Sequence, residues 1–180
     1  MRNKYLTIAL YGGSFDPPHI GHKAIVEALN KLDYIDKIVI MPTFLNPFKC
    51  VSHAPSELRF KWLKEIFKDF KNIKIDRYEV NQKRKVPTIE SVKYLLKTYK
   101  KIYLVIGADN LKDLNKWNNF EELKELVTFI VASRDNIPMD TKFINLNIDE
   151  SVSSSELRKN INISKLPKEC ATEIEQYYKK

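Results

Sequence analysis

Two histidines stand three residues apart beside a cluster of glycines. Three of the four glycines in this 180-residue chain lie within residues 11–22, YGGSFDPPHIGH, which contain His19 and His22. Residues three apart share one face of a helix, so both imidazoles would point the same way. An imidazole N–H donates a hydrogen bond to a phosphate oxygen, more strongly when the ring is protonated. A lone histidine here would more simply cap the helix, but a pair after a glycine turn favours phosphate binding.

The elements around this segment predict a phosphate-binding turn. The apolar residues 6–11 are typical of a buried strand, and residues 24–32 carry apolar side chains at helical spacing. A helix that follows a strand and a glycine turn presents backbone N–H groups and the positive end of its dipole to an anion. Gly12 and Gly13 would let a ligand approach the backbone, while Ser14 adds a hydroxyl group. Neither a G-x-G-x-x-G fingerprint nor a Gly-Lys-Ser/Thr loop occurs, so the turn is of another kind.

Short β-rich runs alternate with helical patterns along the chain. We expect strands over residues 6–11, 37–41, 73–76, 102–106, 127–132 and 143–146. We expect helices over residues 24–32, 58–70 and 92–99, the last two capped by Ser56 and Thr88. This alternation predicts an α/β fold, a Rossmann-like doubly wound parallel sheet, in a single domain over residues 1–180. Ligands of such sheets bind beyond the carboxyl ends of the strands, where Gly12 and Gly107 both fall.

Composition indicates where the protein works and which kinds of partner it binds. All apolar runs are too short to cross a membrane. Cys50 and Cys170 are far apart in the sequence, so we expect reduced thiols and a cytoplasmic protein. The formal net charge is +8, but the lysines are spread along the chain and interleaved with Asp and Glu. This distribution favours a solvated surface over a nucleic-acid-binding face, and it would attract small polyanions such as nucleotides.

Four segments together resemble the H-x-G-H nucleotidyltransferases, and most closely the bacterial nicotinate-nucleotide adenylyltransferases. Besides GGSFDPPHIGH at residues 12–22, residues 106–110 read IGADN and lead into the LNKW of residues 114–117. Residues 152–158, VSSSELR, resemble the family's I-S-S-T-x-x-R motif. Residues 88–91, TIES, resemble the polar helix start that follows the family's third strand. The resemblance covers nearly the whole chain.

The resemblance implies a reaction. Members of the family transfer the adenylyl group of ATP to the phosphate of nicotinate mononucleotide, which releases pyrophosphate and forms deamido-NAD. The nucleophile is a phosphate oxygen that is already anionic near neutral pH, since the second pKa of a phosphomonoester is about 6. The protein therefore has to align two polyanions and neutralise charge in the transition state. Mg²⁺ would accompany ATP, with no metal ligand from a protein side chain.

Roles for single residues follow from the same resemblance. The implied catalytic residues are His19, His22, Lys49 and Arg158. The implied ATP-binding residues are Gly12, Gly13, Ser14, His19, His22, Gly107, Asp109, Ser154, Ser155 and Arg158. The implied nicotinate mononucleotide-binding residues are Lys49, Thr88, Trp117 and Asn118. Structural roles are the alternatives, because Asp109 and the serines could cap the helices that follow them and Trp117 could pack in the core.

At two segments the sequence departs from the family pattern, so more than one molecule could accept the adenylyl group. Residues 46–49 read NPFK where the family has P-P-H-K, and residues 86–88 read VPT where it has S-Y-T. Nicotinamide mononucleotide and phosphopantetheine are alternative acceptors for the same chemistry, and a non-catalytic nucleotide- or RNA-binding protein is the alternative outside the enzymes. The expected partners are ATP and nicotinate mononucleotide, with no nucleic acid and no membrane. A homodimer is compatible with the sequence.

Overall fold

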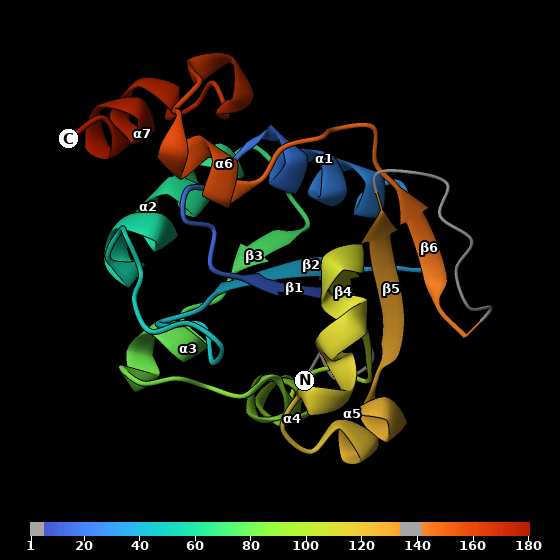
Figure 1. Cartoon of the computed structure of the whole chain (residues 1–180). Coiled ribbons are helices and arrows are strands. Elements are labelled where there is room, and N and C mark those ends of the chain that lie inside the picture. Colours follow the sequence, from blue (N-terminus) through green and yellow to red (C-terminus); the bar gives the residue numbers. More distant parts are fainter. Residues whose placement is uncertain (1–5, 134–141) are drawn as a thin grey trace.

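A six-stranded parallel β-sheet forms the centre of the computed structural model, which describes residues 6–133 and 142–180 (Figure 1). The strands are β1 (Thr7–Gly13), β2 (Lys37–Pro42), β3 (Ile73–Ile75), β4 (Lys101–Gly107), β5 (Thr128–Ser133) and β6 (Ile144–Asn147). They lie in the order β3-β2-β1-β4-β5-β6, and every neighbouring pair runs parallel. Strands covered on both faces need continuous apolar sequence, and Ile8, Ala9 and Leu10 are accordingly buried.

Helices cover both faces of the sheet and build two cores. They are α1 (Ile20–Leu29), α2 (Ser56–Ile66), α3 (Tyr78–Gln82), α4 (Thr88–Leu96), α5 (Phe120–Leu126), α6 (Ser154–Lys159) and α7 (Ala171–Tyr178), with 3-10 helices at η2 (Ala108–Lys116) and η3 (Ile163–Lys165). Alternate residues of a strand point to opposite faces. In β1, Ala9 and Tyr11 join the core shared with α1, α2, α6 and α7, while Ile8 and Leu10 join the core shared with α4, η2 and α5.

The strand order reverses at β1 and β4, and this reversal positions the site. The helix after β1 covers one face of the sheet, whereas the helices after β4 cover the other. Connections that leave neighbouring strands in opposite directions open a crevice beyond their carboxyl ends, where ligands of doubly wound sheets bind. Gly13 ends β1 and Gly107 ends β4, so the glycines stand at this crevice.

The predicted strands are confirmed, each within two residues of its observed ends. The first helix begins at Ile20 rather than at residue 24. Its first turn contains the polar His22 and Lys23, so the helical spacing of apolar residues becomes visible only after them. Within residues 6–133 and 142–180, none of the helices has the length and apolar character needed to cross a membrane.

The two predicted helix caps are wrong. The helices α2 and α4 begin at Ser56 and Thr88 themselves, and the cap residues are Pro55 and Pro87. Each proline has the negative φ that its ring imposes and an extended ψ near 145°, which suits the residue before a helix. The proline takes the cap position, and the hydroxyl residue moves into the first turn.

Candidate active site

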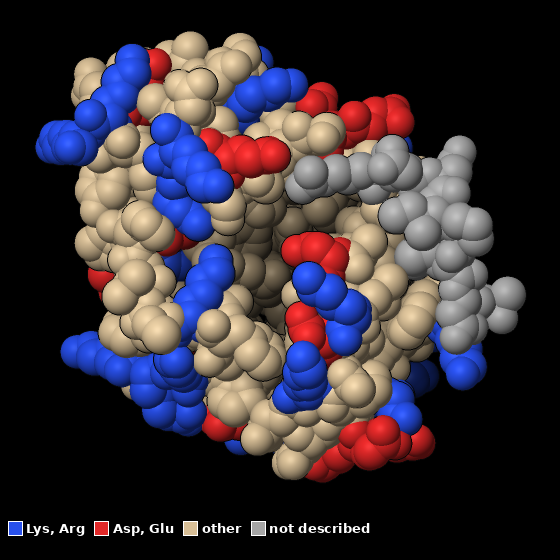
Figure 2. Space-filling model, in the orientation of Figure 1, with Lys and Arg blue, Asp and Glu red and all other residues tan. Residues whose placement is uncertain are grey.

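A cavity of about 750 Å³ opens beyond the carboxyl ends of β1 and β4, and Figure 2 shows the hollow on this face of the molecule. It gathers most of the residues that the sequence singled out. These are Gly12, Gly13, Ser14, His19, His22, Lys49, Thr88, Gly107, Asp109, Trp117, Ser154 and Ser155. Arg158, which is half-buried in α6, and Asn118, which is exposed, lie outside the set of described residues that line the cavity. Segments from both halves of the chain therefore meet at one place.

His19 and His22 are held by reciprocal hydrogen bonds at the start of α1. The backbone N–H of His22 donates to Nδ1 of His19 at 3.4 Å, and the backbone N–H of His19 donates to Nδ1 of His22 at 3.1 Å. This is a capping box made from two histidines. A ring nitrogen that accepts a hydrogen bond carries no proton, so a neutral ring in this geometry has its proton on Nε2. Helix capping and phosphate binding are therefore compatible, since capping uses Nδ1 and a phosphate would be bound through Nε2.

The stacking of the two rings limits their charge. The centroids of His19 and His22 are 3.6 Å apart and the ring planes differ by 23°. Two positive rings at such a separation would repel each other by about 1 to 4 kcal/mol. Protonation at Nδ1 would also remove the acceptor of a capping hydrogen bond. The geometry thus favours neutral histidines. The sequence alone was compatible with protonated histidines as well.

The turn before α1 leaves room for the rings and fixes them. A Cβ at Gly21 would come within 3.0 Å of Cε1 and Nδ1 of His19. The carbonyl of Pro17 accepts a hydrogen bond from Oγ of Ser154 at 2.9 Å, which joins α6 to this turn. Phe15 has a φ of 50° and packs edge-on against His22 with ring centroids 4.9 Å apart. A left-handed backbone costs a bulky residue roughly 1 to 2 kcal/mol, which burial of the Phe15 ring offsets.

Positive and hydroxyl groups gather near the start of α6. Nη1 of Arg158 donates to the carbonyl of Asp16, and its Nη2 donates to Oγ of Ser155 at 3.2 Å. Ser153 caps α6 by accepting a hydrogen bond from its first turn, so the structural role expected for this serine run is confirmed. Partial desolvation and the charge of Arg158 lower the pKa of Lys49. Two cations that repel each other in this way can both be stabilised by one bound polyanion.

The end of β4 and both ends of η2 reach the cavity, through Gly107, Asp109 and Trp117. A Cβ at Gly107 would come within 2.5 Å of Oδ1 of Asp109, so glycine leaves this carboxylate in place. The helix η2 begins at Ala108 with Gly107 as its cap residue, which rules out the cap position for Asp109. Burial, with a further contribution from the charge of Asp109, raises the pKa of Tyr11. Trp117 packs on the core and also lines the cavity, so both roles considered for it are compatible.

Glu79 lines the cavity, although no motif or pattern in the sequence singles it out. It is 6% exposed in α3, and its Oε1 accepts a hydrogen bond from Oγ of Ser91 at 2.6 Å. Burial raises the pKa of Glu79 to about 7, against the opposing effect of the Ser91 hydrogen bond. Ser91 follows Thr88 by one turn of α4, and both line the cavity. A carboxyl group that titrates near neutral pH thus belongs to the same wall as Thr88.

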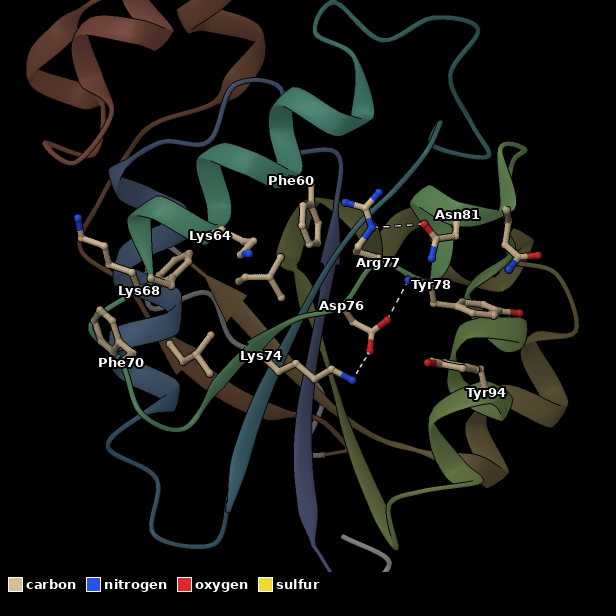
Figure 3. A pocket seen from close by; sticks show the side chains of 14 residues that line it. Phe60, Lys64, Lys68, Phe70, Lys74, Asp76, Arg77, Tyr78, Asn81 and Tyr94 are labelled. Carbon is tan, nitrogen blue, oxygen red and sulfur yellow. Dashed lines mark hydrogen bonds and ion pairs between the residues drawn. The ribbon is translucent and has the colours of Figure 1, made fainter.

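A second cavity, of about 790 Å³, lies along the outer edge of β3 (Figure 3). It is rich in basic side chains, and most of these are already paired with carboxylates. The pairs are Lys68–Glu65, Lys74–Asp76 and Arg77–Glu57. Figure 3 shows Lys74 reaching towards Asp76, and the guanidinium of Arg77 lies over the Phe60 ring. Basic residues beside an edge strand discourage the addition of another strand. The paired charges of this cavity thus have a structural explanation at the edge of the sheet.

The described lining of the cavity beyond β1 and β4 contains neither cysteine of the chain. Among the residues that the structure describes, no three His, Cys, Asp or Glu side chains are grouped so as to hold a metal ion. The expectation that Mg²⁺ arrives on the phosphates of ATP stays a prediction. Cys50 is an exposed free thiol, and Cys170 is a buried one whose pKa burial raises to about 12.

Known proteins resemble this chain over almost its whole length. The family model described as cytidylyltransferase-like matches residues 10–160. A protein of Sulfurimonas denitrificans named "Probable nicotinate-nucleotide adenylyltransferase" is 65% identical over 173 residues, which cover 96% of this chain and 95% of the relative. A Campylobacter jejuni protein with the same name is 47% identical over 178 residues, which cover 97% of this chain and 98% of the relative.

Solved structures share the fold. The nicotinic acid mononucleotide adenylyltransferase of Plasmodium falciparum, complexed with NaAD, matches with a TM-score of 0.71 and 23% identity over 86% of this chain and 83% of that chain. The same enzyme complexed with APC matches with a TM-score of 0.71 and 21% identity over 96% and 94% of the two chains. At these identities the likeness concerns the fold, and it confirms the predicted Rossmann-like α/β class.

Replacing Glu79 by glutamine should stabilise the protein at alkaline pH. A folded-state pKa of about 7, above the ordinary 4.5, means that folding favours the neutral acid. The stability contributed by Glu79 is then fully present below about pH 4.5 and is lost as the pH rises through about 7. Glutamine is neutral at every pH and can keep the Ser91 hydrogen bond. We expect Glu79→Gln to raise the free energy of unfolding by on the order of 1 to 3 kcal/mol at pH 8.5 and by less at pH 5.

Urea denaturation at the two pH values measures this difference. The matched control is Glu125→Gln, which changes an exposed glutamate of α5 and should shift stability equally at both pH values. An effect of Glu79→Gln that is the same at pH 5 and pH 8.5 would contradict the raised pKa.

Proposed function

The chain belongs to the nicotinate-nucleotide adenylyltransferases within the cytidylyltransferase-like family, and we propose that it transfers the adenylyl group of ATP to nicotinate mononucleotide, forming deamido-NAD and pyrophosphate. The observation that carries the proposal is the meeting of the histidine pair, Lys49, the α6 serines and Trp117 in one cavity. These groups supply donors for a triphosphate and an aromatic surface for a pyridine ring.

The proposed reaction is an in-line displacement at the α-phosphorus of ATP. A phosphate oxygen of nicotinate mononucleotide forms a bond to that phosphorus while the bond to the leaving pyrophosphate breaks. The nucleophile is already anionic near neutral pH, so the protein need not remove a proton from it. Negative charge spreads over the oxygens of the α-phosphate and grows on the leaving group, and groups that donate hydrogen bonds to them lower the barrier.

The phosphates of ATP would lie between the starts of α1 and α6. His19 and His22 would donate from Nε2 to the α-phosphate, with His22 carrying most of the effect. The backbone of Gly12, Gly13 and Ser14 would receive the chain of phosphates at the end of β1. The β- and γ-phosphates would lie against α6, with Ser154, Ser155 and Arg158 as donors. Lys49 would neutralise charge where the acceptor phosphate meets the α-phosphate.

The two nucleosides would use the remaining walls of the cavity. Asp109, beside Gly107, is a good acceptor for the hydroxyl groups of a ribose. Trp117 would stack on the pyridine ring, and Thr88 would bind the same nucleotide. Because Asn118 is exposed and does not line the cavity, its contribution would come from its backbone N–H, which can donate to the pyridine carboxylate next to Trp117.

Mg²⁺ fits this site as an ion carried by ATP. The cavity supplies hydroxyl, imidazole and cationic groups for phosphate oxygens, and its described carboxylates, Glu79, Asp109 and Glu150, form no group of three that could hold a metal ion. When carried by ATP, the ion would neutralise negative charge that develops on the leaving pyrophosphate. The free cysteines suit a reducing compartment such as the cytoplasm, and neither nucleic acid nor a membrane takes part in this reaction.

A comparison of acceptors tests the proposed substrate. We expect kcat/KM for pyrophosphate release with ATP and nicotinate mononucleotide to exceed that with nicotinamide mononucleotide by at least about 10-fold, because the two acceptors differ by one charge. Phosphopantetheine should give no measurable release. Equal rates with the acid and the amide would make the acid preference wrong, and no release with any acceptor would contradict an enzymatic role.

Substitution of His22 tests the role of the imidazole. We expect His22→Ala to lower kcat by on the order of 100-fold or more, since it removes a donor from the transition state. His22→Gln is the matched control for folding, because glutamine is a usual partner at this position of a capping box and can restore the hydrogen bond to the backbone of residue 19. The glutamine variant should keep the wild-type melting temperature and still be impaired. Wild-type turnover in His22→Ala would remove His22 from the mechanism.

A further inference from the structure

Asp16 is a buried carboxylate inside the glycine–histidine segment, and the reaction above gives it no role. It is 3% exposed, and its Oδ2 accepts a hydrogen bond from the N–H of His53 at 2.7 Å. Its Oδ1 accepts one from the N–H of Ala54 at 2.9 Å and another from the hydroxyl of Tyr178. Burial alone would raise the pKa of Asp16, but the hydrogen bonds from Tyr178, His53 and Ala54 outweigh it and hold the pKa below its ordinary value. The charged carboxylate of Asp16 therefore joins three segments, namely the glycine–histidine segment, residues 53–54 before α2, and α7; we call this contact the junction.

Arg59 ties the same region together from α2. Its side chain is fully buried and donates to three backbone carbonyls, those of Ser14, Phe44 at 2.9 Å and Ala54 at 3.0 Å. Burial lowers the pKa of Arg59, and the charge of Asp16 acts against this effect. Ser14 lines the cavity, and residues 44 and 54 stand on either side of Lys49. One buried guanidinium thus holds the phosphate turn and both ends of the segment that carries Lys49.

The last helix of the chain completes this junction. The hydroxyl of Tyr177 donates to the carbonyl of His53 at 3.0 Å, next to the N–H group that Asp16 binds. The rings of Tyr177 and Tyr178 pack on Trp62 of α2, with centroids 5.7 and 6.1 Å from its ring. Figure 1 shows α7 and α2 on the same side of the sheet, and both contribute to one core. The packing of α7 on α2 therefore delivers the Tyr178 hydroxyl to the phosphate turn.

We propose that Tyr178 is a positioning residue for the reaction, which acts through Asp16 to hold the phosphate turn and the Lys49 segment in one arrangement. This inference rests on the proposed function. Such support matters because the phosphate turn and the Lys49 segment come from different parts of the chain and meet through the buried hydrogen bonds of Asp16 and Arg59. The carbonyl of Asp16 accepts the hydrogen bond from Arg158, so a shift of Asp16 would move that cation too. A displacement of about 1 Å near the reacting groups can cost about 100-fold in rate.

Tyr178→Phe tests the proposal, because it keeps the ring on Trp62 and removes only the hydroxyl. We expect kcat for pyrophosphate release from ATP and nicotinate mononucleotide to fall by about 10-fold, at a temperature where circular dichroism shows a folded protein. The matched control is Tyr103→Phe in β4, which removes a hydroxyl that accepts a hydrogen bond from Lys101 at 2.9 Å outside the cavity. This control should leave kcat within about 2-fold of wild type.

A double-mutant cycle with Asp16→Asn distinguishes positioning from a general loss of stability. If Tyr178 acts through Asp16, then Tyr178→Phe lowers kcat by less than about 2-fold further in the Asp16→Asn background, whereas independent effects would multiply. Turnover of Tyr178→Phe within about 2-fold of wild type, or a loss that multiplies with that of Asp16→Asn, would overturn the positioning role. A wild-type protein that releases no pyrophosphate with any acceptor would instead overturn the proposed function.

Discussion

The reciprocal hydrogen bonds between the rings and the backbone of His19 and His22 are the interaction on which the site depends. They fix the start of α1, and they place the proton of each neutral ring on Nε2. A neutral pair adds donors without adding charge to a region where Lys49 and Arg158 already repel each other. The site can therefore receive a polyanion mainly through oriented N–H groups, which cost no rearrangement when charge develops.

The surrounding fold keeps this pair in place. Gly21 leaves the space that the ring of His19 fills, Phe15 packs against the ring of His22, and Ser154 joins α6 to the same turn. The reversal of strand order brings the ends of β1 and β4 to one crevice, so residues of η2 line the same cavity as the starts of α1 and α6. Elements that are distant in the sequence thus share one cavity, and the packing of the two cores sets the distances between them.

The sequence predicted the sheet from local patterns, because continuous apolar runs mark parallel strands. Most cavity residues were expected from the resemblance to the family, and they lie where those strands end. The junction at Asp16 has no such signal, since His53 and Tyr178 lie 37 and 162 residues away from it. Glu79 escaped notice because a five-residue helix is too short to show a period. The two predicted caps were wrong because a proline precedes each helix and takes the cap position.

The protonation of the two histidine rings in the presence of ATP tests this account most directly. The chain has three histidines, so the imidazole nitrogens of a ¹⁵N-labelled sample can be assigned with single substitutions and followed by NMR. At pH 7 with ATP bound, we predict that His19 and His22 each show a protonated Nε2 and an unprotonated Nδ1. Rings that are protonated on both nitrogens, or that carry their proton on Nδ1, would contradict the claim that a neutral capping pair binds the phosphates.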